Sequence, residues 1–191
     1  MNRLPTLLAA LALFVATTAA HAQQHLLAAQ SEIAFTSRQM GVPVEGHFRK
    51  FDADIAFDPR QPGAAHIALR IDLASVTLAS SEAEAELAKP GWFDSRRTPI
   101  ASFASSAVKP LGANRFEVAG KLTIKGVARD IVVPISLAAA GAASAATAAT
   151  GSFTIKRLAF GIGDGDWGDT SLVADEVQVR FRLLLTGVAS P

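Results

Sequence analysis

Acidic residues gather in one short segment, Asp164-Gly165-Asp166-Trp167-Gly168-Asp169, where carboxylates stand one or two residues apart. Carboxylates spaced around a glycine are able to wrap a calcium ion, because this hard cation prefers oxygen ligands. The spacing departs from that of an EF-hand, since the third acid comes one residue late and the central glycine precedes it. We therefore interpret the irregular stretch from Gly161 to Asp169 as a solvated loop without a metal.

Catalytic constellations of other kinds are scarce. The chain contains no cysteine, no Gly-x-Ser-x-Gly nucleophile motif and no glycine-rich phosphate loop with a lysine. His47 and His66 fall on the polar phase of strand-like segments, as do the paired acids Asp52 and Asp54. No ionisable group falls on the apolar phase of the clear strand patterns. These features favour a binding protein over an enzyme, with no catalytic residue and no cofactor.

Two large apolar rings, Trp92 and Phe93, follow Pro90-Gly91 and begin no periodic run. We expect them in a loop, where they either plug the end of the fold or line the entry for an apolar ligand. Both alternatives place these rings at an opening of the structure that the rest of the chain forms.

The elements that position these residues show alternation with period two, the spacing that puts every second side chain on one face of a sheet. About eight or nine strands follow from this pattern. The apolar positions on which they rest are Ile33–Phe35, Val42–Phe48, Phe51–Phe57, Ile67–Leu73, Ala101–Phe103, Phe116–Ile124, Ile131–Leu137, Phe153–Ile155 and Val177–Leu185. Phe48 and Leu122 are expected to point inward, and His47 and Lys121 outward.

Two segments depart from the alternation. Ser80 to Lys89 combines a serine cap, early acids, a late lysine and a stop at Pro90-Gly91, which predicts one short helix between the fourth and fifth strands. Ala138 to Thr150 consists almost entirely of small residues, which indicates a loose hairpin tip or a weak edge.

The fold class predicted from these elements is all-β, an antiparallel β-barrel of about eight strands. A barrel of this size either fills its interior with side chains or holds one small ligand. The inward phase carries phenylalanines beside glycines and alanines, an arrangement that suits a solid core and a lined cavity equally well.

Composition and the first residues narrow the function classes. The chain has 191 residues with a formal net charge of +1, so no basic tract points to nucleic acid. Arg3, the apolar run from Leu4 to Val15 and Ala20-His21-Ala22 are typical of a signal peptide over residues 1–22, cleaved before Gln23. No later run is long enough to span a membrane, and the absence of cysteine excludes a lipid-anchoring cysteine. We expect residues 23–191 to form one soluble domain in the periplasm.

The ordered landmarks resemble a known family. They are Ser31-x-Ile33-x-Phe35, Met40-Gly41-x-x-x-Glu45-Gly46-x-Phe48-x-x-Phe51, Ile55-x-Phe57-Asp58-Pro59, Ile71-Asp72-Leu73-Ala74-Ser75-Val76, Trp92-Phe93-Asp94 with Thr98-Pro99-x-Ala101-x-Phe103, Phe116-x-Val118-x-Gly120-x-Leu122-Thr123-x-x-Gly126, and Phe160-Gly161-Ile162. Together they look like the YceI-like family of periplasmic polyisoprenoid-binding proteins. The Glu-rich helix and the Gly-Asp-Trp loop resemble the branch associated with cytochrome b561-type membrane proteins.

The resemblance implies a lipocalin-like barrel around an apolar tunnel that holds an isoprenoid chain, and it shifts the choice between core and cavity toward a bound lipid. The implied function is a carrier or store for a polyisoprenoid, a quinone or a quinone precursor. The expected ligand-binding residues are Phe35, Val44, Phe48, Phe57, Leu69, Phe103, Leu122 and Phe153 along the tunnel, with Trp92, Phe93 and Trp167 near its mouth. Two alternatives stay open: a solid-core interaction domain for a membrane cytochrome b561-type partner, and a small-molecule enzyme that uses the barrel cavity.

Overall fold

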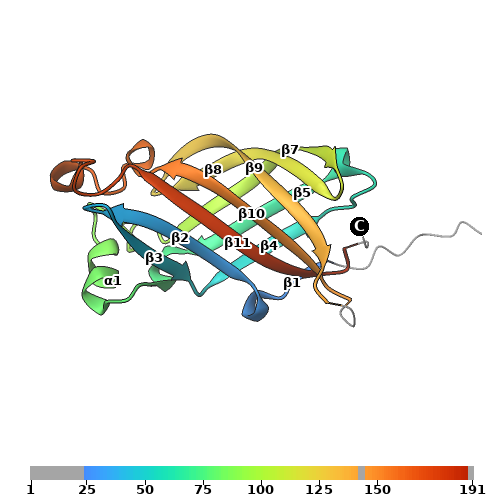
Figure 1. The fold of residues 1–191 in the computed structure, drawn as a ribbon, viewed down its shortest axis with the longest axis horizontal. Helices are drawn as coiled ribbons and strands as arrows, with labels where there is room; N and C mark the ends of the chain where they lie inside the picture. Colours follow the sequence, from blue (N-terminus) through green and yellow to red (C-terminus); the bar gives the residue numbers. More distant parts are fainter. Residues whose placement is uncertain (1–23, 142–144, 189–191) are drawn as a thin grey trace, which may run out of the picture.

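A computed structural model describes residues 24–141 and 145–188, which form one curled antiparallel sheet (Figure 1). The proposed signal segment 1–22 lies outside the described residues. The strands are β1 (His25–Leu26), β2 (Glu32–Gln39), β3 (Val42–Phe48), β4 (Phe51–Ala56), β5 (His66–Asp72), β6 (Val76–Thr77), β7 (Ile100–Gly112), β8 (Arg115–Ile124), β9 (Val127–Ala139), β10 (Thr147–Lys156) and β11 (Glu176–Thr186). One short α-helix, α1 (Ser81–Leu87), lies in the chain between β6 and β7.

The all-β, antiparallel class is confirmed, but the expected number of about eight strands is too low. The described residues form eleven strands, of which β1 and β6 have two residues each. Alternation cannot reveal a two-residue strand, because a period of two needs several residues before it is visible. Strand β7 is also far longer than the Ala101–Phe103 segment. A register shift between Ser105 and Ala107 changes its inward phase, so the alternation does not continue to the buried Val108.

Strand order explains how the sheet closes on itself. The order is β4-β5-β7-β8-β9-β10-β11-β2-β3-β6, with β1 paired to β11. Strands β4 and β6 are the two ends of this order, and β3 is next to β6, yet only Arg49 and Lys50 separate β3 from β4 in the chain. The two edges must therefore meet along a seam. The backbone N–H groups of both residues donate hydrogen bonds to Ser75 there. The Gln24 side chain amide donates to the Phe57 carbonyl oxygen and accepts from the Phe57 N–H.

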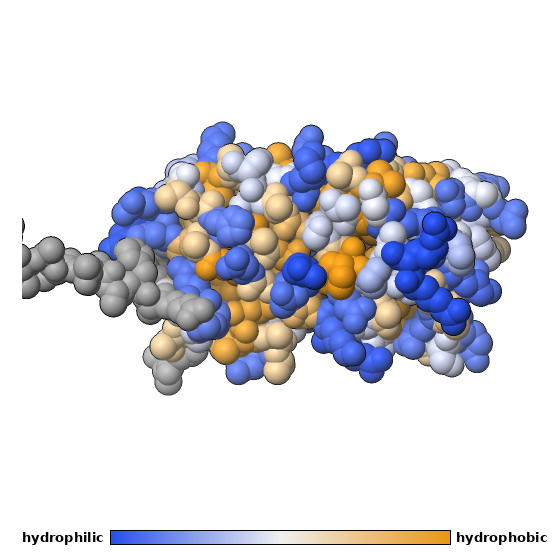
Figure 2. All heavy atoms as spheres, turned by 180° about the vertical axis from the view of Figure 1, so that it is seen from behind, coloured by the Kyte–Doolittle hydropathy of each residue, from blue (hydrophilic) through white to orange (hydrophobic). Residues whose placement is uncertain are grey.

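The two faces of the sheet separate as the alternation predicts. His47, His66, Asp52, Asp54 and Lys121 are all exposed on the outer face. Figure 2 shows hydrophilic side chains spread over this surface, with small apolar areas between them. Apolar side chains of the opposite phase point inward. Removing them from contact with water is the main source of stability in this chain, which has no disulfides.

Inside the sheet, the apolar side chains form two clusters. The first is packed solid and contains Ile33, Phe57, Val108, Phe116, Val118, Leu137, Ala149, Leu183, Leu185 and Val188. The second, around Leu73, Phe93, Leu122, Ile155, Phe160 and Ile162, lies beneath α1 and the loops that join β10 to β11. Figure 1 shows α1 and these loops at the same end of the barrel.

The small-residue segment Ala138 to Thr150 differs from the expected loose tip. Strand β9 continues to Ala139, β10 starts at Thr147, and Ala146 to Ala149 are buried. Ala149 pairs with Leu137 on one side and Leu183 on the other, so its methyl group fits between two larger core side chains. Small side chains are needed at this level because their neighbours already fill the interior. Residues 142–144 are outside the described part of the chain.

Candidate functional site

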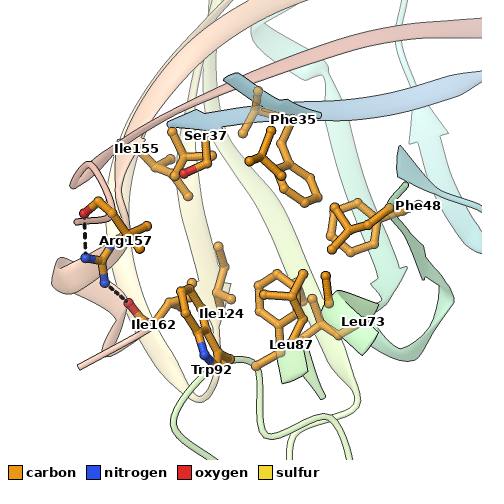
Figure 3. A pocket seen from close by; sticks show the side chains of 18 of the residues that line it. Phe35, Ser37, Phe48, Leu73, Leu87, Trp92, Ile124, Ile155, Arg157 and Ile162 are labelled. Carbon is orange, nitrogen blue, oxygen red and sulfur yellow. Dashed lines mark hydrogen bonds between the residues drawn. The ribbon is translucent and has the colours of Figure 1, made fainter. Parts of the chain in front are cut away.

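An apolar cavity of about 520 Å³ opens inside the second cluster. This volume lies within the range of about 300–1,000 Å³ that is usual for small-molecule sites. Its walls come from seven strands (β2, β3, β5, β7, β8, β10 and β11), from α1 and from the loops around Trp92 and Ile162, and Figure 3 shows their side chains arranged in a ring. The main apolar lining residues are Phe35, Val44, Phe48, Ile71, Leu73, Leu78, Leu87, Trp92, Phe93, Leu122, Ile124, Phe153, Ile155, Ile162, Trp167, Val173, Val177 and Val179.

Most of the residues expected from the sequence meet at this cavity. Eight of the eleven line it: Phe35, Val44, Phe48, Trp92, Phe93, Leu122, Phe153 and Trp167. Their rings form contacts around the wall, with centroids 5.7 Å apart for Phe35 and Phe48, and 5.8 Å apart for Trp92 and Trp167. Trp92 and Phe93 both belong to the cavity wall, and Phe93 is buried.

Phe57, Leu69 and Phe103 do not line this cavity, and their expected role in ligand binding stays a prediction. Phe57 is buried in the solid cluster and meets the Phe116 ring edge to face, with centroids 5.2 Å apart. Leu69 packs against the same cluster. All three side chains lie on the inward-facing phase of the alternation. Alternation predicts which face of the sheet a side chain is on, but not its position along the barrel axis.

Three partly buried side chains lie between the two apolar clusters. Phe48, Ile71 and Phe103 each pack against both apolar clusters. The ring of Phe103 covers Gly120, where a Cβ would stand 2.5 Å from a ring carbon. Phe48 and Ile71 line the cavity, and so does Ile33 of the first cluster, whereas Phe103 does not.

Arg157 is a wall residue that the sequence analysis missed. It follows β10 directly, is 2% exposed, and contributes its side chain to the cavity lining. Phe153, Ile155 and Arg157 share one phase of the alternation, and this spacing is the signal that could have revealed an inward arginine. Its side chain also lies over the Trp92 ring, with the guanidinium carbon 5.9 Å from the ring centroid.

Backbone carbonyls occupy every hydrogen-bond donor of the Arg157 guanidinium. Nε donates to the Ala174 carbonyl oxygen at 3.1 Å, and the two terminal nitrogens donate to those of Ile162, Gly163, Trp167 and Val173. Burial lowers the pKa of the guanidinium, while the charge of Asp175 opposes the shift. One buried cation thus holds together the loops that form part of the cavity wall.

The other polar residues of the lining are exposed or half-buried, and they mark the opening. Ser37, Gln39 and Ser80 contribute neutral groups there, and Glu82 and Glu86 of α1 contribute carboxylates. Ser80 is the N-cap of α1, and its hydroxyl donates to the Glu82 carboxylate at 2.6 Å. This hydrogen bond lowers the pKa of Glu82 and keeps it ionised.

The acidic loop takes a different form from a metal site. Asp164 and Asp166 are exposed, and the Asp169 carboxylate accepts hydrogen bonds from the backbone N–H and the hydroxyl of Ser171. Within residues 24–141 and 145–188, no group of three or more His, Asp or Glu side chains is placed to hold a metal ion. The same part of the chain contains no helix with the length and apolarity needed to cross a bilayer.

Known structures share this fold. BcnA of Burkholderia cenocepacia is 43% identical, with a TM-score of 0.79 over 83% of this chain and 98% of that protein. A Campylobacter jejuni YceI protein matches at 22% identity and a TM-score of 0.65, over 73% of this chain and 82% of that one. A polyisoprenoid-binding domain of Saccharophagus degradans matches at 18% identity and a TM-score of 0.66, over 88% of this chain and 99% of that domain. The last two likenesses concern the fold alone.

Sequence comparison supports the same relationship. A UPF0312 protein of Azotobacter vinelandii is 30% identical over 88 residues, and one of Vibrio cholerae is 27% identical over 114 residues. These alignments span 46% and 60% of the relatives, so this chain matches only about half of their length. The profile of the YceI-like domain matches residues 25–185, which is nearly the whole described part of the chain. The protein therefore belongs to the YceI-like domain family.

Proposed function

We propose that this protein is a periplasmic carrier or store for an isoprenoid-type lipid, such as a polyisoprenoid, a quinone or a quinone precursor. The observation that supports this most is the cavity of about 520 Å³, whose lining is apolar apart from Arg157 and the polar residues Ser37, Gln39, Ser80, Glu82 and Glu86. An apolar tail would enter the cavity, and a polar head would stay near α1. The Saccharophagus degradans domain, described as polyisoprenoid-binding, has the same fold.

The physical chemistry of such a site favours tail binding. Burying a methylene-sized group contributes about 0.8 kcal/mol, so a five-carbon isoprene unit contributes about 4 kcal/mol before the cost of ordering it. A short isoprenoid, or the end of a longer one, fits a cavity of this volume.

The decisive experiment replaces one residue of the cavity wall with a larger one, so that the new side chain occupies the space of the ligand. Leu122 lines it and is 7% exposed, whereas the neighbouring Lys121 points outward and pairs with Asp130 on the surface. We expect Leu122→Trp to displace the lipid with little loss of stability, and Lys121→Trp to change neither property. The measurements are the lipid recovered per protein, by organic extraction and mass spectrometry, and the melting temperature.

The opposite result is equally clear. If the interior were solid in solution, Leu122→Trp would overpack it and destabilise the protein by about 1–3 kcal/mol. Wild-type protein that yields no lipid, together with an unfolded Leu122→Trp variant, would refute the carrier and favour a solid interaction domain.

The periplasmic location rests on the signal-like residues 1–22. We expect cleavage after Ala22, so that the mature protein begins at Gln23 and appears in an osmotic-shock fraction. N-terminal sequencing tests the cleavage, and recovery of the intact chain in the inner membrane would contradict it.

We also propose a membrane cytochrome b561-type partner. The two segments that suggest it, α1 and the Gly-Asp-Trp loop, lie at the same end of the barrel, around the cavity opening (Figure 1). Cross-linking from this end in membranes that contain such a cytochrome tests the partner, and the absence of a cross-linked product would refute it without affecting the carrier.

A further inference from the structure

We propose that the cavity opening rejects anionic head groups, so that the ligand is an isoprenoid-type lipid with an uncharged or cationic head. Glu82 and Glu86 of α1 are the residues that make this selection. The inference rests on the proposed carrier function and specifies the chemical class of its ligand. Three features of the cavity lining support it.

First, Arg157 is not available as an anion receptor. An arginine at a binding site ordinarily recognises phosphate or carboxylate by directing its fork of N–H donors at the ligand. Here all five donors already bond backbone carbonyl oxygens. Figure 3 shows the guanidinium on the outer side of the ring of side chains, turned toward the Ile162 segment and away from the centre of the cavity.

Second, the charges that do face the opening are negative. Glu82 and Glu86 belong to the lining. The Ser80 hydroxyl holds the Glu82 carboxylate at 2.6 Å, and the Lys89 ammonium pairs with Glu86. Lys89 itself is not part of the lining, so it reduces the field of Glu86 without offering a donor to the ligand.

Third, the remaining polar groups of the lining are neutral. Ser37, Gln39 and Ser80 can exchange hydrogen bonds with an alcohol, a carbonyl or an ammonium group. A diphosphate at the same place would lose its water and meet two carboxylates without a cationic donor in return. Juxtaposed like charges act as a device of specificity because they penalise the wrong ligand more than they help the right one.

Three probes with the same isoprenoid tail distinguish the contribution of the head group to binding from that of the tail: farnesol, farnesylamine and farnesyl diphosphate. The chain has two tryptophans, Trp92 and Trp167, and both lie in the cavity wall, so intrinsic fluorescence of the mature, delipidated protein reports binding. We expect farnesylamine to bind at least as tightly as farnesol, and farnesyl diphosphate to bind at least about tenfold more weakly. Added salt should narrow the difference, because the carboxylates are near solvent.

Variants assign the selection to its residues. The double change Glu82→Gln and Glu86→Gln should reduce the discrimination against farnesyl diphosphate at least about threefold while leaving farnesol affinity unchanged. Glu117→Gln removes a surface charge from β8 that does not line the cavity, and should leave all three affinities unchanged.

Each other outcome refutes a distinct statement. Equal or tighter binding of farnesyl diphosphate by the wild type overturns the rejection of anions, while the carrier function stands. Discrimination that the double variant leaves intact overturns the assignment to Glu82 and Glu86. If none of the three probes binds, the proposed function itself fails, and the inference fails with it.

Discussion

Replacing Arg157 tests whether one buried cation holds the cavity wall together. Arg157→Met keeps a long apolar side chain against Trp92 but removes all five donors, which leaves the carbonyls of Ile162, Gly163 and Val173 without their partner. Hydrogen bonds to a charged group contribute about 1.5–3 kcal/mol each, but bonds made by one group are not additive. A buried polar group left without its partner costs about 1–3 kcal/mol, so we expect the three carbonyls together to cost about 3–5 kcal/mol.

A loss of this size is a large part of the total stability of about 5–15 kcal/mol that is usual for a domain. Urea denaturation should therefore show a clearly lower midpoint for Arg157→Met with an unchanged slope. Arg157→Lys keeps the charge but has three donors and no planar fork, so its loss should be intermediate. Lys156→Met, at the exposed neighbouring position, is the matched control and should stay within about 0.5 kcal/mol of the wild type.

Local measurements distinguish this role from a general loss of packing. Amide hydrogen exchange in residues 161–173 of Arg157→Met should accelerate more than exchange in β7 and β8, because the carbonyls that Arg157 binds lie in and next to this segment. The reasoning is refuted if Arg157→Met costs less than about 1 kcal/mol, or if exchange accelerates evenly over the molecule.

Three further predictions concern other parts of the chain. Gly120→Ala should lower the free energy of unfolding by about 1–3 kcal/mol, because its Cβ would stand 2.4 Å from the carbonyl oxygen of Ala104; Gly91→Ala, where nothing lies within 4 Å, should have little effect in the same urea titration. Calcium or a chelator should leave the melting temperature unchanged, because a solvated loop gains nothing from the ion, and a concentration-dependent rise would contradict this interpretation. Hydrogen bonds from Ser171 lower the pKa of Asp169 below its usual value of 3.8. The contribution of Asp169 to stability is therefore complete above its pKa in the unfolded chain and is lost as the pH falls through its pKa in the folded protein. An NMR titration midpoint at or above 3.8 would contradict this prediction.

Short-range pattern was sufficient for the class of fold and for most of the cavity wall. Alternation along β2, β3, β8 and β10 placed Phe35, Phe48, Leu122 and Phe153 on one face, because the extended backbone itself imposes a period of two. The break in this pattern at Pro90-Gly91 set Trp92 apart from the strands. The helix followed from Ser80 and the early glutamates, since capping and the helix dipole act over a single turn.

Tertiary structure alone decided what stands at each level along the barrel. Phe57, Leu69 and Phe103 have the same inward phase as the cavity residues, but curling of the sheet brings them against Phe116 and Gly120. The buried segment around Ala149 depends likewise on the strands that flank it. The role of Arg157 was hidden for the same reason: its five acceptors become neighbours only when the chain folds the loops before β11 around it. The period of two determines in which direction each side chain points from the backbone. A cavity, in contrast, is the space that segments distant in the sequence leave unfilled when they pack together.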